Sequence, residues 1–135
     1  MYKYSFKPHI ADIRMQIEAS SRKEIFTGAL EGMTDLMNIL QQTGGRNKLR
    51  SFKIEAQDDV SLLIDFLNEI LARICIDKVK YHLKKFELNP GCTVEGIISG
   101  SPTEKFQKDV KAVTFHEAYF REIREGVWEA MVIFD

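Results

Sequence analysis

Proline, cysteine and unbalanced charge are all scarce in this sequence of 135 residues, which contains three prolines and two cysteines. Nineteen Lys and Arg residues against twenty Asp and Glu residues leave a net charge of −1, so bulk electrostatics predict neither non-specific nucleic-acid binding nor membrane-surface binding. No apolar run approaches the roughly 18 residues that a membrane span requires, and the first residues lack the apolar stretch of a secretory signal. Cys75 and Cys92 belong to no CxxC pair or Cys/His cluster. These absences predict a cytoplasmic protein with reduced thiols and argue against a zinc site.

Recognisable catalytic motifs are also missing. The sequence contains no GxSxG motif, no HExxH motif and no Cys/His pairing, so the usual nucleophiles and zinc-hydrolase sites are not indicated. Gly44-Gly45 is too short to cradle a phosphate, and it follows a predicted helix instead of starting one. Nothing positive supports a catalytic domain, and the sequence predicts a protein that is not an enzyme.

Two segments have the periodicity of helices. The first is predicted over residues 21–40, because Ser21 and Glu24 have the spacing of a capping box and a glycine pair follows the last apolar residue. The second is predicted from a cap at Asp58 or Asp59 to about residue 76. Its apolar stripe is wide, which indicates a helix close to full burial.

The remaining apolar residues alternate as in strands. The predicted strands cover residues 2–6, 10–19, 48–56, 79–88, 92–99, 114–123 and 127–134. Such strands with two helices predict an α+β fold, a two-layer sandwich in which both helices pack on one face of a mostly antiparallel sheet. We expect a single domain that spans residues 1–135.

Three segments contain residues that suit a binding site. His9-Ile10-Ala11-Asp12-Ile13 places an imidazole and a carboxylate at the start of a predicted strand. Lys111-Ala112-Val113-Thr114-Phe115-His116 is a lysine-led run that enters another strand. The last segment, residues 128–135, is an apolar strand that ends on an acid. Taken singly, each segment is more often a solvated strand end than a functional site.

Together, in this order and spacing, the three segments resemble the archease family, small proteins that activate RtcB-type RNA ligases. That family shows a His-Thr-Ala-Asp segment near its start, a Lys-Ala-Val-Thr-Tyr-His segment near its end, and a terminal strand that closes on Asp. The predicted helix that contains Gly32-Met33-Thr34-Asp35 is also similar to the family's first helix. The resemblance covers Tyr4 to Asp135, and it departs from the family pattern at Ile10, where Thr is usual.

The resemblance implies a divalent metal ion, calcium in this family, held by the acids of the first and last segments. By position these acids are Asp12 and Asp135. Oxygen ligands suit Ca²⁺ better than zinc, and a bound cation relieves the repulsion between two converging carboxylates. His9 and His116 are candidates for orienting the carboxylates. Lys111 matches the family's functional lysine, and we expect it to face a partner or a nucleotide.

The resemblance further implies a partner and a role. The protein would help an RtcB-type RNA ligase attach GMP to its active-site histidine and turn over repeatedly, in tRNA splicing or RNA repair. The GTP and Mn²⁺ of that reaction belong to the ligase. RNA would be contacted indirectly, and no membrane would be involved.

Two other functions stay open at this point. Two carboxylates that hold a metal could assist phosphate-ester hydrolysis, as in a metal-dependent phosphodiesterase. A basic stripe on one face of the predicted strand 79–88 could bind RNA, as in an RNA-binding or chaperone-like module. The same stripe fits an edge strand that lysines protect against unwanted pairing. Its members are Lys78, Lys80, His82 and Lys84.

Overall fold

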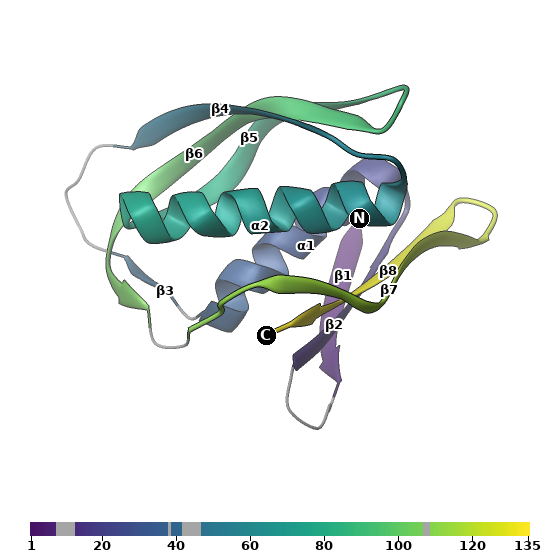
Figure 1. Ribbon diagram of the computed structural model, residues 1–135, viewed down its shortest axis with the longest axis horizontal. Coiled ribbons are helices and arrows are strands. Elements are labelled where there is room, and N and C mark those ends of the chain that lie inside the picture. Colours follow the sequence, from purple (N-terminus) through teal and green to yellow (C-terminus); the bar gives the residue numbers. More distant parts are fainter. Residues whose placement is uncertain (8–12, 38, 42–46, 107–108) are drawn as a thin grey trace.

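Two helices lie between two antiparallel sheets in the computed structural model (Figure 1). The structure describes residues 1–7, 13–37, 39–41, 47–106 and 109–135. In chain order the elements are β1 (Tyr2–Lys7), β2 (Ile13–Ala19), α1 (Arg22–Met37), β3 (Ile39–Gln41), β4 (Lys48–Glu55), α2 (Asp59–Asp77), β5 (Val79–Asn89), β6 (Thr93–Phe106), β7 (Val113–Arg124) and β8 (Val127–Phe134).

The strand order brings the two ends of the chain into one sheet. The first sheet has the order β1-β2-β8-β7, and all of its neighbouring strands are antiparallel. The second sheet is built on β6, which pairs antiparallel with β3, β4 and β5. The last strand, β8, therefore lies between β2 from the start of the sequence and β7.

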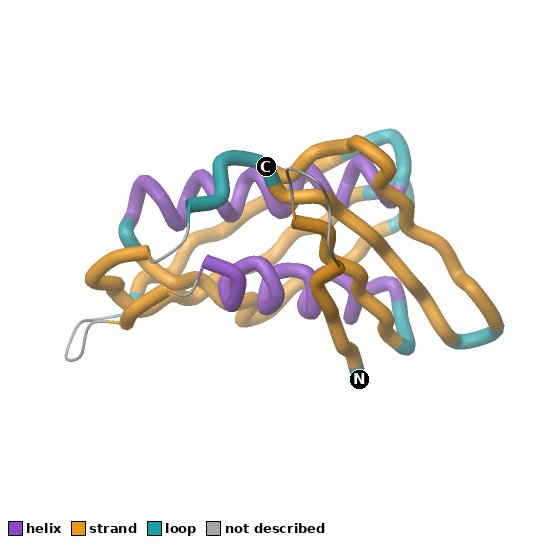
Figure 2. Tube along the Cα trace, turned by 90° about the horizontal axis from the view of Figure 1, so that it is seen from below, coloured by secondary structure: helices purple, strands orange, loops and turns teal. Residues whose placement is uncertain are grey.

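Each helix contacts both sheets. Helix α1 packs on β1, β2 and β8 of the first sheet and on β5 of the second. Helix α2 packs on β7 of the first sheet and on β4, β5 and β6 of the second. In Figure 1, β4 and β5 lie above α2 together with most of β6, while β7 and β8 lie below it. Figure 2, seen from below, shows the two helices as separate rods beside each other. The helices thus form a middle layer.

A series of aromatic rings links the three layers. Trp128 and Phe120 of the first sheet lie 6.0 Å apart between ring centroids, and Phe120 lies 6.0 Å from Phe26 of α1. Phe26 is 5.4 Å from Phe66 of α2, which is 5.6 Å from Phe52 of β4. Rings at these separations and tilted angles attract one another beyond their burial from water. The series connects both sheets through both helices.

The α+β class, the two helices and the antiparallel pairing predicted from the sequence are confirmed. The strands, however, form two sheets where the sequence analysis expects one. The reason lies in α2, where the consecutive residues Leu62, Leu63 and Ile64 are all fully buried. Three successive helical positions cover about 200° of the helix circumference, so one sheet on one side cannot bury them.

Two predicted boundaries are wrong. Helix α1 ends at Met37, and Ile39–Gln41 form β3 in place of the expected last helical turn. Strand β6 continues to Phe106 instead of ending near residue 99, because its far part pairs with β3. The predicted strand 10–19 begins at Ile13 in the described part, and residues 10–12 lie outside it.

Both helices begin with a side-chain cap. The Ser21 hydroxyl oxygen accepts a hydrogen bond from the Glu24 N–H (3.1 Å), and the Asp58 carboxylate accepts one from the Ser61 N–H (2.8 Å). The Glu24 carboxylate pairs with the amino terminus of Met1, which ties β1 to the start of α1. No helix in the described ranges has both the length and the apolar character needed to cross a membrane.

Gly96 lies in β6 directly against the backbone of β5. A Cβ atom added there would be 2.1 Å from the Lys85 carbonyl oxygen and 2.6 Å from the Phe86 Cα. Because backbone atoms cannot swing aside, we expect Gly96→Ala to lower the free energy of unfolding by about 2 kcal/mol. Urea unfolding measures this loss. Ser99→Ala, on the same strand, is the control and should stay within about 0.5 kcal/mol of wild type. Equal stability of the two variants would contradict the close approach.

Tyr4 of β1 donates a hydrogen bond to the Asp35 carboxylate of α1. This bond, burial and the charge of Asp35 raise the pKa of Tyr4 to about 12 from the ordinary value of 10.0. The folded state therefore favours the neutral phenol, and this stabilisation is complete below pH 10 and is lost as the pH rises towards 12. We expect the difference in unfolding free energy between wild type and Tyr4→Phe to stay constant below pH 10 and to shrink above it. Denaturant unfolding across this pH range tests the expectation, and a difference that does not change would refute it.

Candidate functional site

The three segments singled out in the sequence meet at one end of the first sheet. Phe134 of β8 is paired with Ile13 of β2 on one side and with Val113 of β7 on the other. These residues belong to the last, the first and the second segment respectively. The C-terminus marked in Figure 1 lies at this end of β8. Segments that are remote in the sequence are therefore neighbours across three strands.

The backbone holds Lys111 and Asp135 next to each other. The Lys111 N–H donates a hydrogen bond to the Asp135 carbonyl oxygen, and the Asp135 N–H donates one to the Ala112 carbonyl oxygen, both at 2.9 Å. Lys111 and Asp135 are both exposed. An ammonium group and a carboxylate are thus presented to solvent from one fixed piece of backbone.

Asp12 and His9 of the first segment lie outside the described residues. Ile13 follows Asp12 in the chain, and it is paired with Phe134, the residue before Asp135. The register therefore joins the start of β2 to the end of β8. Two acids that come from the two ends of the sequence require such an arrangement in order to share one cation.

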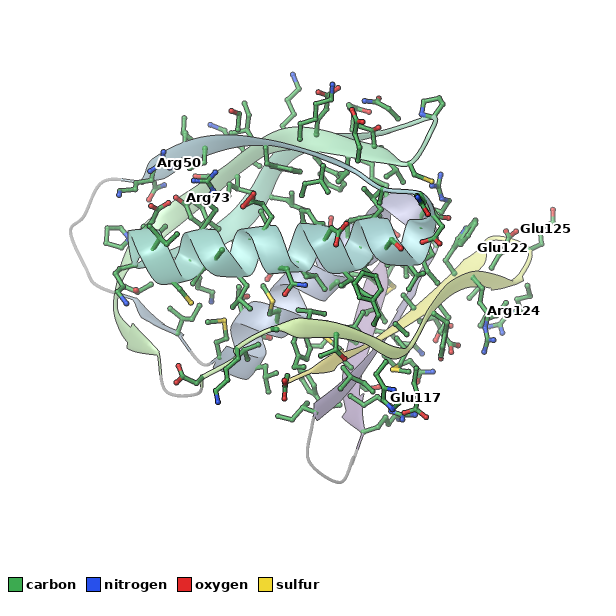
Figure 3. All side chains as sticks on the ribbon, in the orientation of Figure 1. Arg50, Arg73, Glu117, Glu122, Arg124 and Glu125 are labelled. Carbon is green, nitrogen blue, oxygen red and sulfur yellow. The ribbon has the colours of Figure 1, made fainter. Side chains whose placement is uncertain are left out.

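His116 and Glu117 lie beside the same end of the sheet. The His116 Nε2 is 3.7 Å from the Glu117 Oε2, and the His116 side chain is exposed. Glu117 also forms a 2.6 Å ion pair with Arg14, the second residue of β2, and Figure 3 labels Glu117 next to that strand. This contact connects the second segment to the first.

The oxygen donors at this end suit a hard cation. Asp135 contributes an exposed carboxylate, and Thr114, opposite Ile133, has a buried hydroxyl oxygen that finds no hydrogen-bond partner among the described residues. Carboxylate and hydroxyl oxygens fit Ca²⁺ or Mg²⁺ better than zinc. Within the described residues, no group of three or more His, Cys, Asp and Glu side chains is placed to hold a metal. The described part therefore supplies only one of the two acids expected at the site.

Other polar groups on the outer face of the first sheet satisfy one another. The Gln16 side-chain amide donates to the Tyr119 hydroxyl oxygen at 3.0 Å and to Glu129 at 2.6 Å, and the Tyr119 hydroxyl donates to Glu129 at 2.5 Å. Burial and the bond to Glu129 raise the pKa of Tyr119. A hollow of about 270 Å³ on this face is lined by Gln16 and Glu129 but not by Lys111 or Asp135. We assign this cluster to cohesion between the strands.

Asn68 of α2 fixes the start of β7, and the sequence analysis did not single it out. Its side-chain amide donates to the Val113 carbonyl oxygen (2.9 Å) and accepts from the Val113 N–H (2.8 Å). Among the described strands β7 pairs only with β8, so Asn68 takes the place of a neighbouring strand. An asparagine between Ile64 and Leu71 on an apolar stripe is the signal that points to such a role.

The lysine stripe is less regular than the sequence predicts. Lys78 has a left-handed backbone conformation and caps the end of α2, and a bulge between Leu83 and Lys85 takes Lys84 out of the ladder. Within the described part, the strand that contains the stripe, β5, pairs only with β6. These features favour the interpretation of a lysine-protected edge strand over that of a continuous basic face.

Comparison with known sequences gives one consistent match. A model of the archease protein family matches residues 4–135. A protein archease of Methanosarcina acetivorans is 27% identical over 143 residues, and the match covers 98% of this chain and 95% of the relative. A protein archease of Thermococcus kodakarensis is 25% identical over 142 residues, with coverage of 100% and 99%. The similarity extends over essentially the whole length of both relatives.

Solved structures share the fold. The solution structure of a Methanobacterium thermoautotrophicum protein superposes with a TM-score of 0.69 at 23% identity, covering 98% of this chain and 97% of that one. The crystal structure of an archease from Thermotoga maritima gives a TM-score of 0.67 at 20% identity, with coverage of 96% and 95%. At these identities the likeness shows the common fold.

The contact between Asn68 and Val113 predicts a local loss of protection. Asn68→Leu removes both hydrogen bonds at similar side-chain volume, and we expect faster hydrogen exchange at the Val113 amide and about 1–3 kcal/mol less stability. Asn68→Asp keeps the acceptor for the Val113 N–H but loses the donor to the Val113 carbonyl oxygen, so it should preserve part of the slow exchange. Asp65→Asn, at an exposed position of α2, is the control. An unchanged exchange rate of the Val113 amide in Asn68→Leu would show that the Asn68 side chain does not hold the start of β7.

Proposed function

This chain belongs to the archease family, and on that premise we propose that it activates an RtcB-type RNA ligase without being an enzyme itself. In this role it helps the ligase attach GMP to its active-site histidine and turn over repeatedly, in tRNA splicing or RNA repair. The GTP and Mn²⁺ belong to the ligase, and RNA is contacted through it.

The observation that carries the proposal is the meeting of the three family segments at one end of the first sheet. Ile13, Phe134 and Val113 are consecutive across three strands, and the N–H of the exposed Lys111 donates a backbone hydrogen bond to the exposed Asp135. Neither exposed residue contributes to the core. Exposed polar residues gathered from remote parts of a chain are typical of a binding surface carried by a rigid scaffold.

We assign Asp12 and Asp135 as the protein ligands of a divalent cation, with Ca²⁺ as the ion. The cation would neutralise two acids that otherwise repel each other and would fasten the start of β2 to the end of β8. His9 and His116 would orient these carboxylates. The oxygen chemistry of Asp135 and the pairing of Ile13 with Phe134 support this assignment.

Lys111 supplies the charge that meets the partner. An activator must bind the guanylylation-competent ligase more tightly than the product-bound ligase, because a protein that binds both states equally does not change the equilibrium between them. An exposed ammonium group next to a carboxylate can pair with a phosphate or an acidic side chain that only one of these states presents. Lys111 therefore acts in recognition and not as a nucleophile.

The test is RNA ligation by a cognate RtcB-type ligase present at limiting concentration. We expect the wild-type protein to convert single turnover of the ligase into multiple turnover. The variants Asp135→Ala, Asp12→Ala and Lys111→Ala should each lower this activated turnover by about tenfold or more. Losses of this size are typical when a group of a metal site is removed. Wild-type protein freed of calcium before the assay should activate as poorly as the aspartate variants, and only the aspartate variants, not Lys111→Ala, should lose affinity for Ca²⁺. The Ca²⁺ affinity of each protein is measured by titration calorimetry.

Matched controls separate the site from general effects of charge. Glu125→Ala removes an exposed acid at the β7–β8 turn, which Figure 3 shows far from Glu117, and Lys53→Ala removes an exposed lysine of β4. Both variants should activate like wild type. No activation of a competent ligase by the wild-type protein would reject the proposal. Salt-sensitive RNA binding without ligase would favour an RNA-binding module, and metal-dependent cleavage of a phosphodiester would favour an enzyme.

A further inference from the structure

Strand β7 contains an insertion next to the candidate site. Its pairs Thr114–Ile133 and Tyr119–Met131 leave four residues of β7, 115–118, opposite the single residue Val132 of β8. We call residues 115–118 the β7 knuckle. Three extra residues in one strand interrupt the ladder and turn the side chains that follow to the other face.

The knuckle leaves an aromatic side chain in solvent. In an uninterrupted strand, position 115 would share the face of Val113, which is 3% exposed and packs in the core. Phe115 is instead 56% exposed. An aromatic ring is among the side chains that stabilise a core most when buried. Regular strand alternation would bury Phe115, and the knuckle instead leaves its ring exposed, so the fold loses the stabilisation that burial of this ring would provide.

The knuckle is held in place from two sides. Glu117 has a left-handed backbone conformation with φ of 55°, and its carboxylate forms the 2.6 Å ion pair with Arg14 of β2. Ala118 packs against the core from the other side. A non-glycine residue in this conformation persists only where its surroundings impose it, and such positions cluster at functional sites. The exposure of Phe115 is thus built into the structure.

Position distinguishes Phe115 from the exposed residues Leu49 and Ile76. Leu49 is 57% exposed and Ile76 is 73% exposed, and both adjoin the Arg50–Asp77 ion pair between β4 and the end of α2. Figure 3 shows Arg50 and Glu117 on opposite sides of the molecule. Phe115 alone of these three residues belongs to the segment that starts at Lys111, whose N–H bonds to Asp135.

We propose that Phe115 is the apolar anchor that docks this protein on its partner, the ligase of the proposed function on which this inference rests. The ring inserts into an apolar pocket of the partner, and Lys111, four residues earlier, meets an acidic group on the rim of that pocket. A protein pocket is favoured over an RNA base because Glu117 of the knuckle and the exposed Asp135 bring acidic groups to this end of the sheet, and acidic groups disfavour RNA phosphates. A central aromatic residue in a polar rim is the usual form of a binding hot spot.

The experiment measures the affinity of Phe115→Ala for a purified cognate RtcB-type ligase. We expect the dissociation constant to rise by about tenfold or more, as for an aromatic hot spot, and Phe115→Leu to recover part of the loss. Leu49→Ala and Ile76→Ala remove apolar side chains elsewhere that are at least as exposed as Phe115, and both variants should bind like wild type. The Ca²⁺ affinity and the unfolding midpoint of Phe115→Ala should stay unchanged, because the ring lies outside the core.

The outcomes separate this inference from the function on which it rests. If Phe115→Ala binds a ligase that the protein activates as tightly as wild type does, Phe115 is not the docking residue, and the proposed activator role is unaffected. Failure of the wild-type protein to bind or activate the ligase would overturn both. Unchanged ligase binding together with weaker retention of single-stranded RNA by Phe115→Ala would mean that the ring stacks on a base, and the docking proposal would be rejected.

Discussion

The structure depends on the burial of two helices from two sides at once. Because α2 is apolar around most of its circumference, it is stable only with a sheet on each side, and the aromatic series from Trp128 to Phe52 runs through this middle layer. Burial of large aromatic and aliphatic side chains is the main favourable term in folding. The division of the strands into two sheets follows from this requirement.

The same requirement creates the candidate site. A sheet that covers the helices on one side has β8 in its interior, with β2 and β7 beside it. The antiparallel pairing then sets the start of β2, the end of β8 and the start of β7 at one edge. There the Lys111 N–H bonds to the Asp135 carbonyl oxygen and the Asp135 N–H bonds to the Ala112 carbonyl oxygen. Core packing fixes the register, and the register positions the exposed groups without burying them.

Strand β7 combines rigidity with exposure. It lies at the edge of its sheet in the described part of the chain, and unpaired edge groups invite unwanted association. The Asn68 side chain of α2 forms hydrogen bonds with the backbone N–H and carbonyl groups of Val113. The β7 knuckle interrupts the rest of the edge, and the ion pair between Arg14 and Glu117 holds the knuckle in place. An edge protected in this way keeps Phe115 and Lys111 exposed while resisting random strand pairing.

The sequence by itself determined the elements whose signals are local. The caps at Ser21 and Asp58, the apolar period of the helices and the alternation of residues 127–134 predict their positions closely, since each depends on neighbours a few residues apart. The three family segments also identified Asp135, Lys111 and His116 as one candidate set, although Asp12 and His9 lie outside the described residues. Only the tertiary structure decided the second sheet, β3, the contact between Asn68 and Val113, and the exposure of Phe115. These features depend on which strands become neighbours, and strand pairing is settled by the packing of the whole core, which no local pattern encodes.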